Sequence, residues 1–215
     1  SHERYVRALA REMRKEYEYI HQQGFVIQLD CPDLANEYAK RFWDKPIGDY
    51  RKVIEIHVAA LNEAIAGIPT DRVRLHLCYG NYEAPHTHDP ALADIIDIAY
   101  QARVGAISIE LCNPRHQHEL KVLRDRPLPD GMVLIPGVID TLTSFVEHPE
   151  LVADRLCAAV ATVGDRERVM AGADCGFSTF AGNERVPPSV VWAKFAAMAE
   201  GARIASERLW GKKQP

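Results

Sequence analysis

The sequence contains no uninterrupted apolar stretch of the length that a membrane-spanning helix needs, about 20 residues. It also has no excess of basic residues, because 26 Lys and Arg stand against 30 Asp and Glu, which gives a formal net charge of -4. Proteins that bind nucleic acid through its phosphates need clustered positive charge. The opening residues, Ser1-His2-Glu3-Arg4, lack the basic and then apolar pattern of a signal peptide. These absences predict a soluble cytoplasmic protein whose partners include neither nucleic acid nor a membrane.

Two further signatures are missing. The chain has 5 cysteines, an odd number at irregular spacing, so the sequence does not indicate a disulfide framework. Free thiols or metal ligands are the better interpretation. No GxGxxG or GxxxxGK[ST] motif follows a predicted strand, which removes the support for the two common nucleotide-binding folds.

Helical and strand patterns alternate along the chain. Apolar residues three or four apart predict helices, and short apolar runs between turn residues predict buried strands. We expect strands at Phe25–Asp30, Arg72–Cys78, Ala106–Glu110, Met132–Asp140 and Arg168–Ala173. We expect helices at Glu3–Gln22, Asp33–Trp43, Tyr50–Ala66, Ala91–Arg103, Gln117–Arg124, Pro149–Val163 and Pro188–Arg208. This alternation predicts an α/β fold with a parallel sheet, and the length suits a single domain of residues 1–215.

Polar residues that can carry chemistry stand at or just past the carboxyl ends of the predicted strands. They are Asp30, His76, Cys78, Glu110, Asp140, Asp174 and Cys175. For any one of them, the resumption of polarity at the end of a strand is an equally good explanation. In a (β/α)8 barrel, however, this edge of the strands is the catalytic face, where residues from several strands converge. The repetition over five strands therefore favours a barrel-type active site.

The His76-Leu77-Cys78 triplet carries the clearest chemistry. Residues i and i+2 of a strand point to the same face with about 6.5 to 7 Å between their Cα atoms, so both side chains can reach one metal ion. With Glu110 and Cys175 from the ends of other strands, the donors are an imidazole nitrogen, two thiolates and a carboxylate. That set suits tetrahedral zinc. His86 and His88 form a second histidine pair, which we interpret as loop residues rather than as a second metal site.

Five segments of the chain occur in an order and with residue types that resemble a known family. They are Val26–Asp30, His76–Asn81, Ile107–Glu110, Gly137–Asp140 and Asp174–Phe177. The resemblance is to the catalytic domain of cobalamin-independent methionine synthase and its zinc-dependent thiol alkyltransferase relatives, which include epoxyalkane:coenzyme M transferase. It extends over nearly all of the chain. It implies a (β/α)8 TIM barrel, of which this chain resembles the C-terminal portion with about five of the eight β/α units.

The resemblance also implies roles for individual residues. It makes His76, Cys78, Glu110 and Cys175 the ligands of a Zn2+ cofactor. This ion would stabilise a substrate thiol as thiolate, and Glu110 is the ligand that the substrate would displace. Asp30 would hold the amino group of a homocysteine-like thiol, and Asp30 and Asp140 would be catalytic residues. Asp174, together with Asp30, would bind substrate. The implied activity is that of a 5-methyltetrahydropteroyltriglutamate-homocysteine S-methyltransferase, which takes a methyl group from a methyl-folate donor in methionine biosynthesis.

The sequence departs from the family pattern in two places. Methionine synthases have a histidine after the Gly-Val-x-Asp segment, whereas this chain continues Asp140-Thr141-Leu142-Thr143. Transfer of another alkyl group to a thiol such as coenzyme M, with an epoxide donor, is therefore an alternative. The five strands also leave the barrel incomplete, so we expect another chain or an N-terminal segment to complete it. A third alternative is a non-catalytic binding subunit that zinc stabilises.

Overall fold

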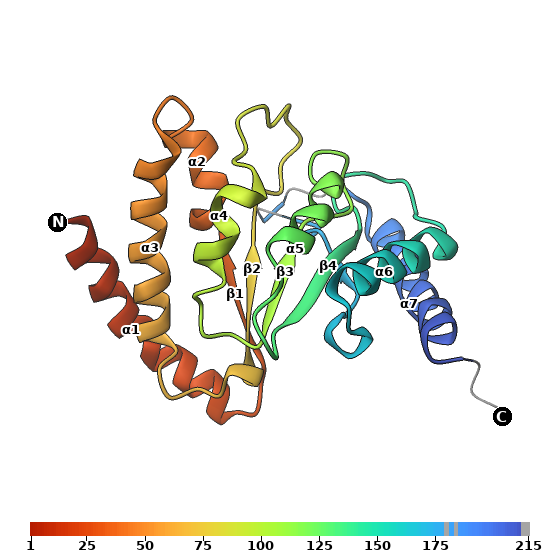
Figure 1. The fold of residues 1–215 in the computed structure, drawn as a ribbon, viewed down its shortest axis with the longest axis horizontal. Helices are drawn as coiled ribbons and strands as arrows, with labels where there is room; N and C mark the ends of the chain where they lie inside the picture. The colour runs from red at the N-terminus through yellow and green to blue at the C-terminus, as the bar shows by residue number, and fades with distance from the viewer. Residues whose placement is uncertain (179–180, 183–184, 212–215) are drawn as a thin grey trace. The chain divides into compact units, whose positions relative to one another are not determined.

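The computed structural model describes residues 1–178, 181–182 and 185–211, and its helices and strands alternate as the sequence predicts (Figure 1). The strands are β1 (Ile27–Cys31), β2 (Val73–Leu77), β3 (Ala106–Ile109), β4 (Val133–Ile139) and β5 (Gly172–Ala173). The α-helices are α1 (His2–Gln22), α2 (Asn36–Arg41), α3 (Ile47–Ala64), α4 (Leu92–Ala99), α5 (Val122–Asp125), α6 (Pro149–Val163) and α7 (Pro188–Trp210). The described residues also form four short 3-10 helices: η1 (Pro32–Leu34), η2 (Thr70–Arg72), η3 (Gln117–Lys121) and η4 (Arg166–Arg168).

The strands form a five-stranded sheet in the order β1-β2-β3-β4-β5, and both β1 with β2 and β4 with β5 pair in parallel. Each strand thus neighbours the next strand in the chain, and parallel neighbours need a crossover connection, which the helices supply. An unbroken sequential order is typical of a β/α barrel, whereas open doubly wound sheets reverse their order at a switch point. The predicted α/β fold class is confirmed.

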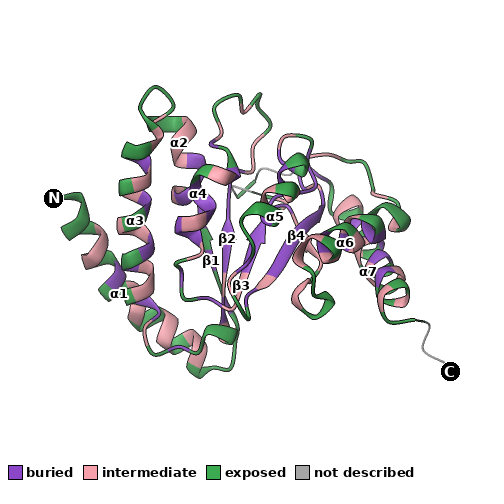
Figure 2. Ribbon diagram, viewed as in Figure 1, coloured by how far each residue is buried: buried purple, intermediate pink, exposed green. Residues whose placement is uncertain are grey.

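The chain divides into two compact parts. The first consists of Ser1–Tyr79, His86–Ile107 and Pro129–Met132, and the second of Gly80–Pro85, Ser108–Leu128 and Val133–Pro215. In the first part, α1 packs on α3 through the buried Ala10, Ala60 and Ala64. Side chains this small allow two helices to approach closely. Figure 2 shows that α1 otherwise carries mostly exposed and half-buried residues.

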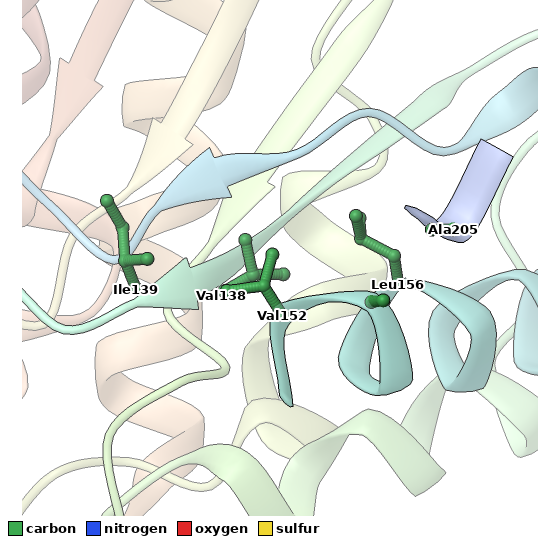
Figure 3. Close-up of a cluster of buried hydrophobic side chains, with 6 residues drawn as sticks. Val138, Ile139, Val152, Leu156 and Ala205 are labelled. Atoms are coloured by element: carbon green, nitrogen blue, oxygen red, sulfur yellow. The ribbon is translucent and has the colours of Figure 1, made fainter. Parts of the chain in front are cut away.

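The core of the second part lies between β4 and the two helices α6 and α7. Val138 and Ile139 of β4 pack with Val152 and Leu156 of α6 and with Ala205 of α7 (Figure 3). Helices α6 and α7 are in close contact at Gly201, because a Cβ atom there would lie 2.5 Å from Val152 Cγ1. Among the described residues, no helix is both long and apolar enough to span a membrane.

Several predicted boundaries are wrong, most clearly at three elements. The first strand begins at Ile27, because Phe25 and Val26 are exposed and precede the pairing with β2. The last strand is Gly172–Ala173 rather than Arg168–Ala173, because residues 166–168 form the turn η4, in which the Asp165 carboxylate accepts a hydrogen bond from the backbone N–H of Glu167. Such local side-chain bonds compete with strand pairing. The helix expected at Asp33–Trp43 is similarly divided into η1 and α2.

Candidate metal centre

The first part of the chain contributes the carboxyl ends of β1 and β2. His76 lies in β2 and is buried, and Cys78 is buried just after the strand ends. The parallel register pairs Asp30 of β1 with His76. Partners in register point to the same face of a sheet, so Asp30 stands beside His76 on that face. Asp30 is exposed, whereas Cys31 points the other way and is buried, in agreement with the alternating burial along β1.

The second part contributes the residues that follow β3 and β5. Glu110 comes directly after β3 and is only 2% exposed. Its Oε2 atom accepts hydrogen bonds of 3.2 Å from Asn113 Nδ2 and from Arg115 Nη2. Cys175 follows β5 and is half-buried. The Glu110 carboxylate is therefore held by two donors of the loop that follows it.

Asp174, next to Cys175, is buried and accepts hydrogen bonds from the same loop. Its oxygens accept from the backbone N–H groups of Leu111, Cys112 and Asn113, at 2.8 to 3.0 Å. Burial raises the pKa of the Asp174 carboxyl, while the hydrogen bonds from Cys112 and Asn113 act in the opposite direction. Its predicted role in substrate binding stays a prediction.

Asp140 follows β4 and is half-buried. Its backbone N–H donates to Glu147 Oε1 at 2.8 Å, and its own carboxylate accepts from the N–H of Leu142 at 2.9 Å. Glu147 in turn forms an ion pair with Lys194 of α7, 2.9 Å from Nζ to Oε2, and the Lys194 side chain is completely buried. The two residues are 47 positions apart, so no local sequence pattern predicts this pair, although it determines how the segment after Asp140 is held. The catalytic role of Asp140 stays a prediction.

The four residues that the sequence predicts as metal ligands form a group that could hold a metal ion. One donor atom from each of His76, Cys78, Glu110 and Cys175 lies within 4.8 Å of the other three. Protein zinc sites bind donors of these types at about 2.0–2.3 Å, usually four of them in a tetrahedron. Imidazole, thiol and carboxyl groups are donors that zinc accepts. The residues present therefore fit such an ion.

The other histidines have different neighbours. His86 Nδ1 lies 3.1 Å from Asp89 Oδ2, and the His88 ring stacks on Trp43 with 4.6 Å between the ring centroids. Within the described residues, neither histidine belongs to a group of metal donors. His116 is buried with its Nδ1 atom 2.8 Å from Glu119 Oε2. These contacts agree with the interpretation of His86 and His88 as loop residues.

The fold is that of part of a β/α barrel, and the donor group is a candidate metal centre at the carboxyl ends of its strands. No protein-family model matches the chain. Among curated proteins, the chain is 25% identical over 182 residues to the 2-hydroxypropyl-CoM lyase of Xanthobacter autotrophicus, a match that covers 73% of this chain and 46% of that protein. Among solved structures, the chain is similar to a B12-independent methionine synthase from Shewanella sp. W3-18-1 in complex with selenomethionine, with a TM-score of 0.73 and 23% identity. This match covers 99% of this chain and 57% of that chain.

These comparisons confirm the resemblance that the sequence motifs indicate. The chain is similar to cobalamin-independent methionine synthase and to a coenzyme M relative, and it has the fold of part of the synthase. It spans about half the length of these relatives, 46% of the lyase and 57% of the synthase.

Proposed function

We propose that this chain carries the zinc-binding and thiol-activating half of an enzyme that transfers a methyl group to the sulfur of a homocysteine-like thiol. The observation that carries the proposal is the group of four donor atoms that lie within 4.8 Å of one another. Transfer to homocysteine would make methionine, and the reaction would belong to methionine biosynthesis. An odd number of cysteines at irregular spacing suits a reducing compartment such as the cytoplasm.

The donor set suits activation of a sulfur nucleophile. A zinc ion held by His76, Cys78, Glu110 and Cys175 would supply a Lewis acid that keeps a substrate thiol deprotonated near neutral pH. Two thiolates and a carboxylate are electron-rich donors, and they would leave the sulfur nucleophilic. The substrate thiolate would then attack the methyl carbon, so that a sulfur–carbon bond forms as the bond from carbon to the donor nitrogen breaks.

Glu110 is the ligand that we expect to make room for the substrate, because a carboxylate is the hardest of the four donors. Its Oε2 atom accepts 3.2 Å hydrogen bonds from Asn113 and Arg115. These two donors would hold the Glu110 carboxylate and compensate its charge.

Asp30 and Asp140 have separate roles in this proposal. Asp30 is exposed and in register with His76, which supports a role in holding the substrate amino group beside the metal. The leaving nitrogen of a methyl-folate needs a proton, and Asp140 is the carboxyl that we assign to that transfer, since this chain has Thr141-Leu142-Thr143 after it rather than the family histidine.

A second candidate function is alkyl transfer to coenzyme M, because the curated protein that the chain matches is a 2-hydroxypropyl-CoM lyase. The coverage of that protein is 46%, so its substrate is not carried over as the first choice. The experiment for both candidates incubates the zinc-loaded protein with homocysteine or coenzyme M and with a methyl-folate or epoxypropane. Mass spectrometry identifies the thioether. Methionine from the first pair supports the proposal, and 2-hydroxypropyl-coenzyme M supports the alternative.

We also propose that further β/α units cover the free edge of β1. Within the first part, α1, β1 and α3 surround a cavity of about 470 Å³ whose lining includes Tyr5, Leu9 and Leu61. Tyr5 is 63% exposed and Leu9 46% exposed, which is unusual for apolar side chains beside a sheet edge. The relatives have the additional length that such units need. If the chain alone is a monodisperse, active monomer in light scattering and in the thioether assay, no such covering segment is required.

A further inference from the structure

Asp174 extends its carboxylate away from β5 to the loop that follows β3. Oδ1 accepts from the backbone N–H of Leu111 at 3.0 Å and of Cys112 at 2.8 Å. Oδ2 accepts from the backbone N–H and from the side-chain Nδ2 of Asn113, both at 2.8 Å. The side chain is buried with 2% exposure. Four donors from three consecutive residues therefore bind one buried carboxylate, an arrangement in which each hydrogen bond is strengthened by the charge of the acceptor.

The sheet leaves space for this contact. Strand β4 lies between β3 and β5, so the Asp174 side chain must pass it to reach the loop. It does so at Gly137 of β4, where an added Cβ atom would overlap with Oδ1 of Asp174 and would lie 2.9 Å from its Cα atom. The absence of a side chain at Gly137 is thus a condition for the hydrogen bonds, and any larger residue would displace the carboxylate.

These hydrogen bonds join Leu111, the residue after Glu110, to Asp174, the residue before Cys175. We propose that Asp174 is a positioning residue for the metal centre, which fixes the backbone next to Glu110 relative to the backbone next to Cys175. This assigns Asp174 to holding the ligands rather than to holding the substrate. The inference rests on the proposed function, because it concerns the metal that these residues would bind.

Asn113 extends the same contact to the ligand side chain. Its Nδ2 atom donates to Asp174 at 2.8 Å and to Glu110 at 3.2 Å. Its Oδ1 atom accepts from the backbone N–H of Arg115 at 3.0 Å, which fixes the orientation of the amide. The Asp174 carboxylate therefore orients the amide that in turn orients the Glu110 carboxylate. Partners that orient metal ligands in this way typically change metal affinity 10- to 100-fold when they are removed.

The test compares zinc affinity in Asp174→Asn with that of the wild-type protein, by competition with a chromophoric chelator. Asparagine has the same shape as aspartate. Its NH2 group, however, would face N–H donors at the place where aspartate has an oxygen that accepts their hydrogen bonds. We expect zinc binding to weaken about 10- to 100-fold in protein that remains folded by circular dichroism. Asp154→Asn is the matched control, because Asp154 is an exposed carboxylate of α6 whose contact is Arg208, at 2.7 Å, and its substitution should leave zinc affinity unchanged.

The outcomes separate this inference from the proposed function. If the wild-type protein binds zinc and folded Asp174→Asn binds it within twofold as tightly, Asp174 has a structural role only and the inference is overturned, while the proposed function stands. If the wild-type protein binds no zinc, both are overturned. Should Asp174→Asn not fold, Asn113→Ala replaces it, since this variant removes only the side-chain amide. Weaker zinc binding in that variant supports the inference, and unchanged binding overturns it.

Discussion

Replacement of Lys194 by methionine tests the buried ion pair that holds the segment after Asp140. Lys194 is completely buried, its Nζ atom lies 2.9 and 3.1 Å from the two oxygens of Glu147, and it also donates to the carbonyl of Phe145. The Glu147 side chain is 9% exposed, so without Lys194 its charge would stay buried and uncompensated. Removal of one partner of such a pair costs about 3–5 kcal/mol.

The assay is thermal unfolding followed by circular dichroism. For a chain of this size, each kcal/mol lowers the unfolding midpoint by about 2–4 °C, so Lys194→Met should lower it by roughly 6–20 °C. The control is Arg208→Met, which removes exposed ion pairs with Glu150 and Asp154 and should cost about 0–1 kcal/mol for each pair. The double variant Lys194→Met/Glu147→Gln should recover part of the loss, because it removes the uncompensated charge. A midpoint for Lys194→Met within about 2 °C of the wild type would show that Lys194 does not compensate a buried charge on Glu147.

Two further predictions concern packing and thiol reactivity. Gly201→Ala puts a methyl group 2.5 Å from Val152 Cγ1 and should destabilise the protein by about 1–3 kcal/mol. The control is Gly48→Ala in α3, where a Cβ atom meets nothing within 4 Å, and this variant should stabilise the protein by up to about 1 kcal/mol. Urea unfolding measures both variants, and equal midpoints would contradict the packing between α6 and α7. Burial raises the pKa of the Cys31 and Cys112 thiols. Iodoacetamide at pH 8 should therefore label neither cysteine in the native protein and both in urea. Mass spectrometry locates the label, and rapid labelling of either cysteine in the native protein would contradict its burial.

The parallel α/β arrangement and the convergence of polar residues at the strand ends could be predicted from the sequence, because both depend on regular spacing. The carboxyl ends of parallel strands meet at one edge, so residues at the strand ends, such as Cys78 and Glu110, are expected to converge whatever the details of the loops. Helix Pro149–Val163 has the predicted limits, since proline at its first position and Gly164 at its end are strong boundary signals.

The contacts that hold the donors could not be predicted in the same way. Asp174 and Asn113 are 61 residues apart, and Lys194 and Glu147 are 47 residues apart, so no local pattern connects them. One signal was present in α7, whose buried residues are Lys194, Ala197, Gly201 and Ala205. Lys194 continues a buried stripe of small residues at helical spacing, and a lysine in such a position needs an acidic partner.

Zinc content measured by mass spectrometry of the purified protein shows whether the four donor residues bind a metal ion. We expect about one zinc per chain. We expect Cys78→Ser and Cys175→Ser each to lose most of it, because the serine hydroxyl is a poor zinc ligand at neutral pH. Cys157→Ser is the matched control, since Cys157 packs against the core of α6 and α7 and lies outside the donor group, and it should retain the metal. Full zinc content in both ligand variants, or no zinc in the wild-type protein under zinc-replete conditions, would contradict the account.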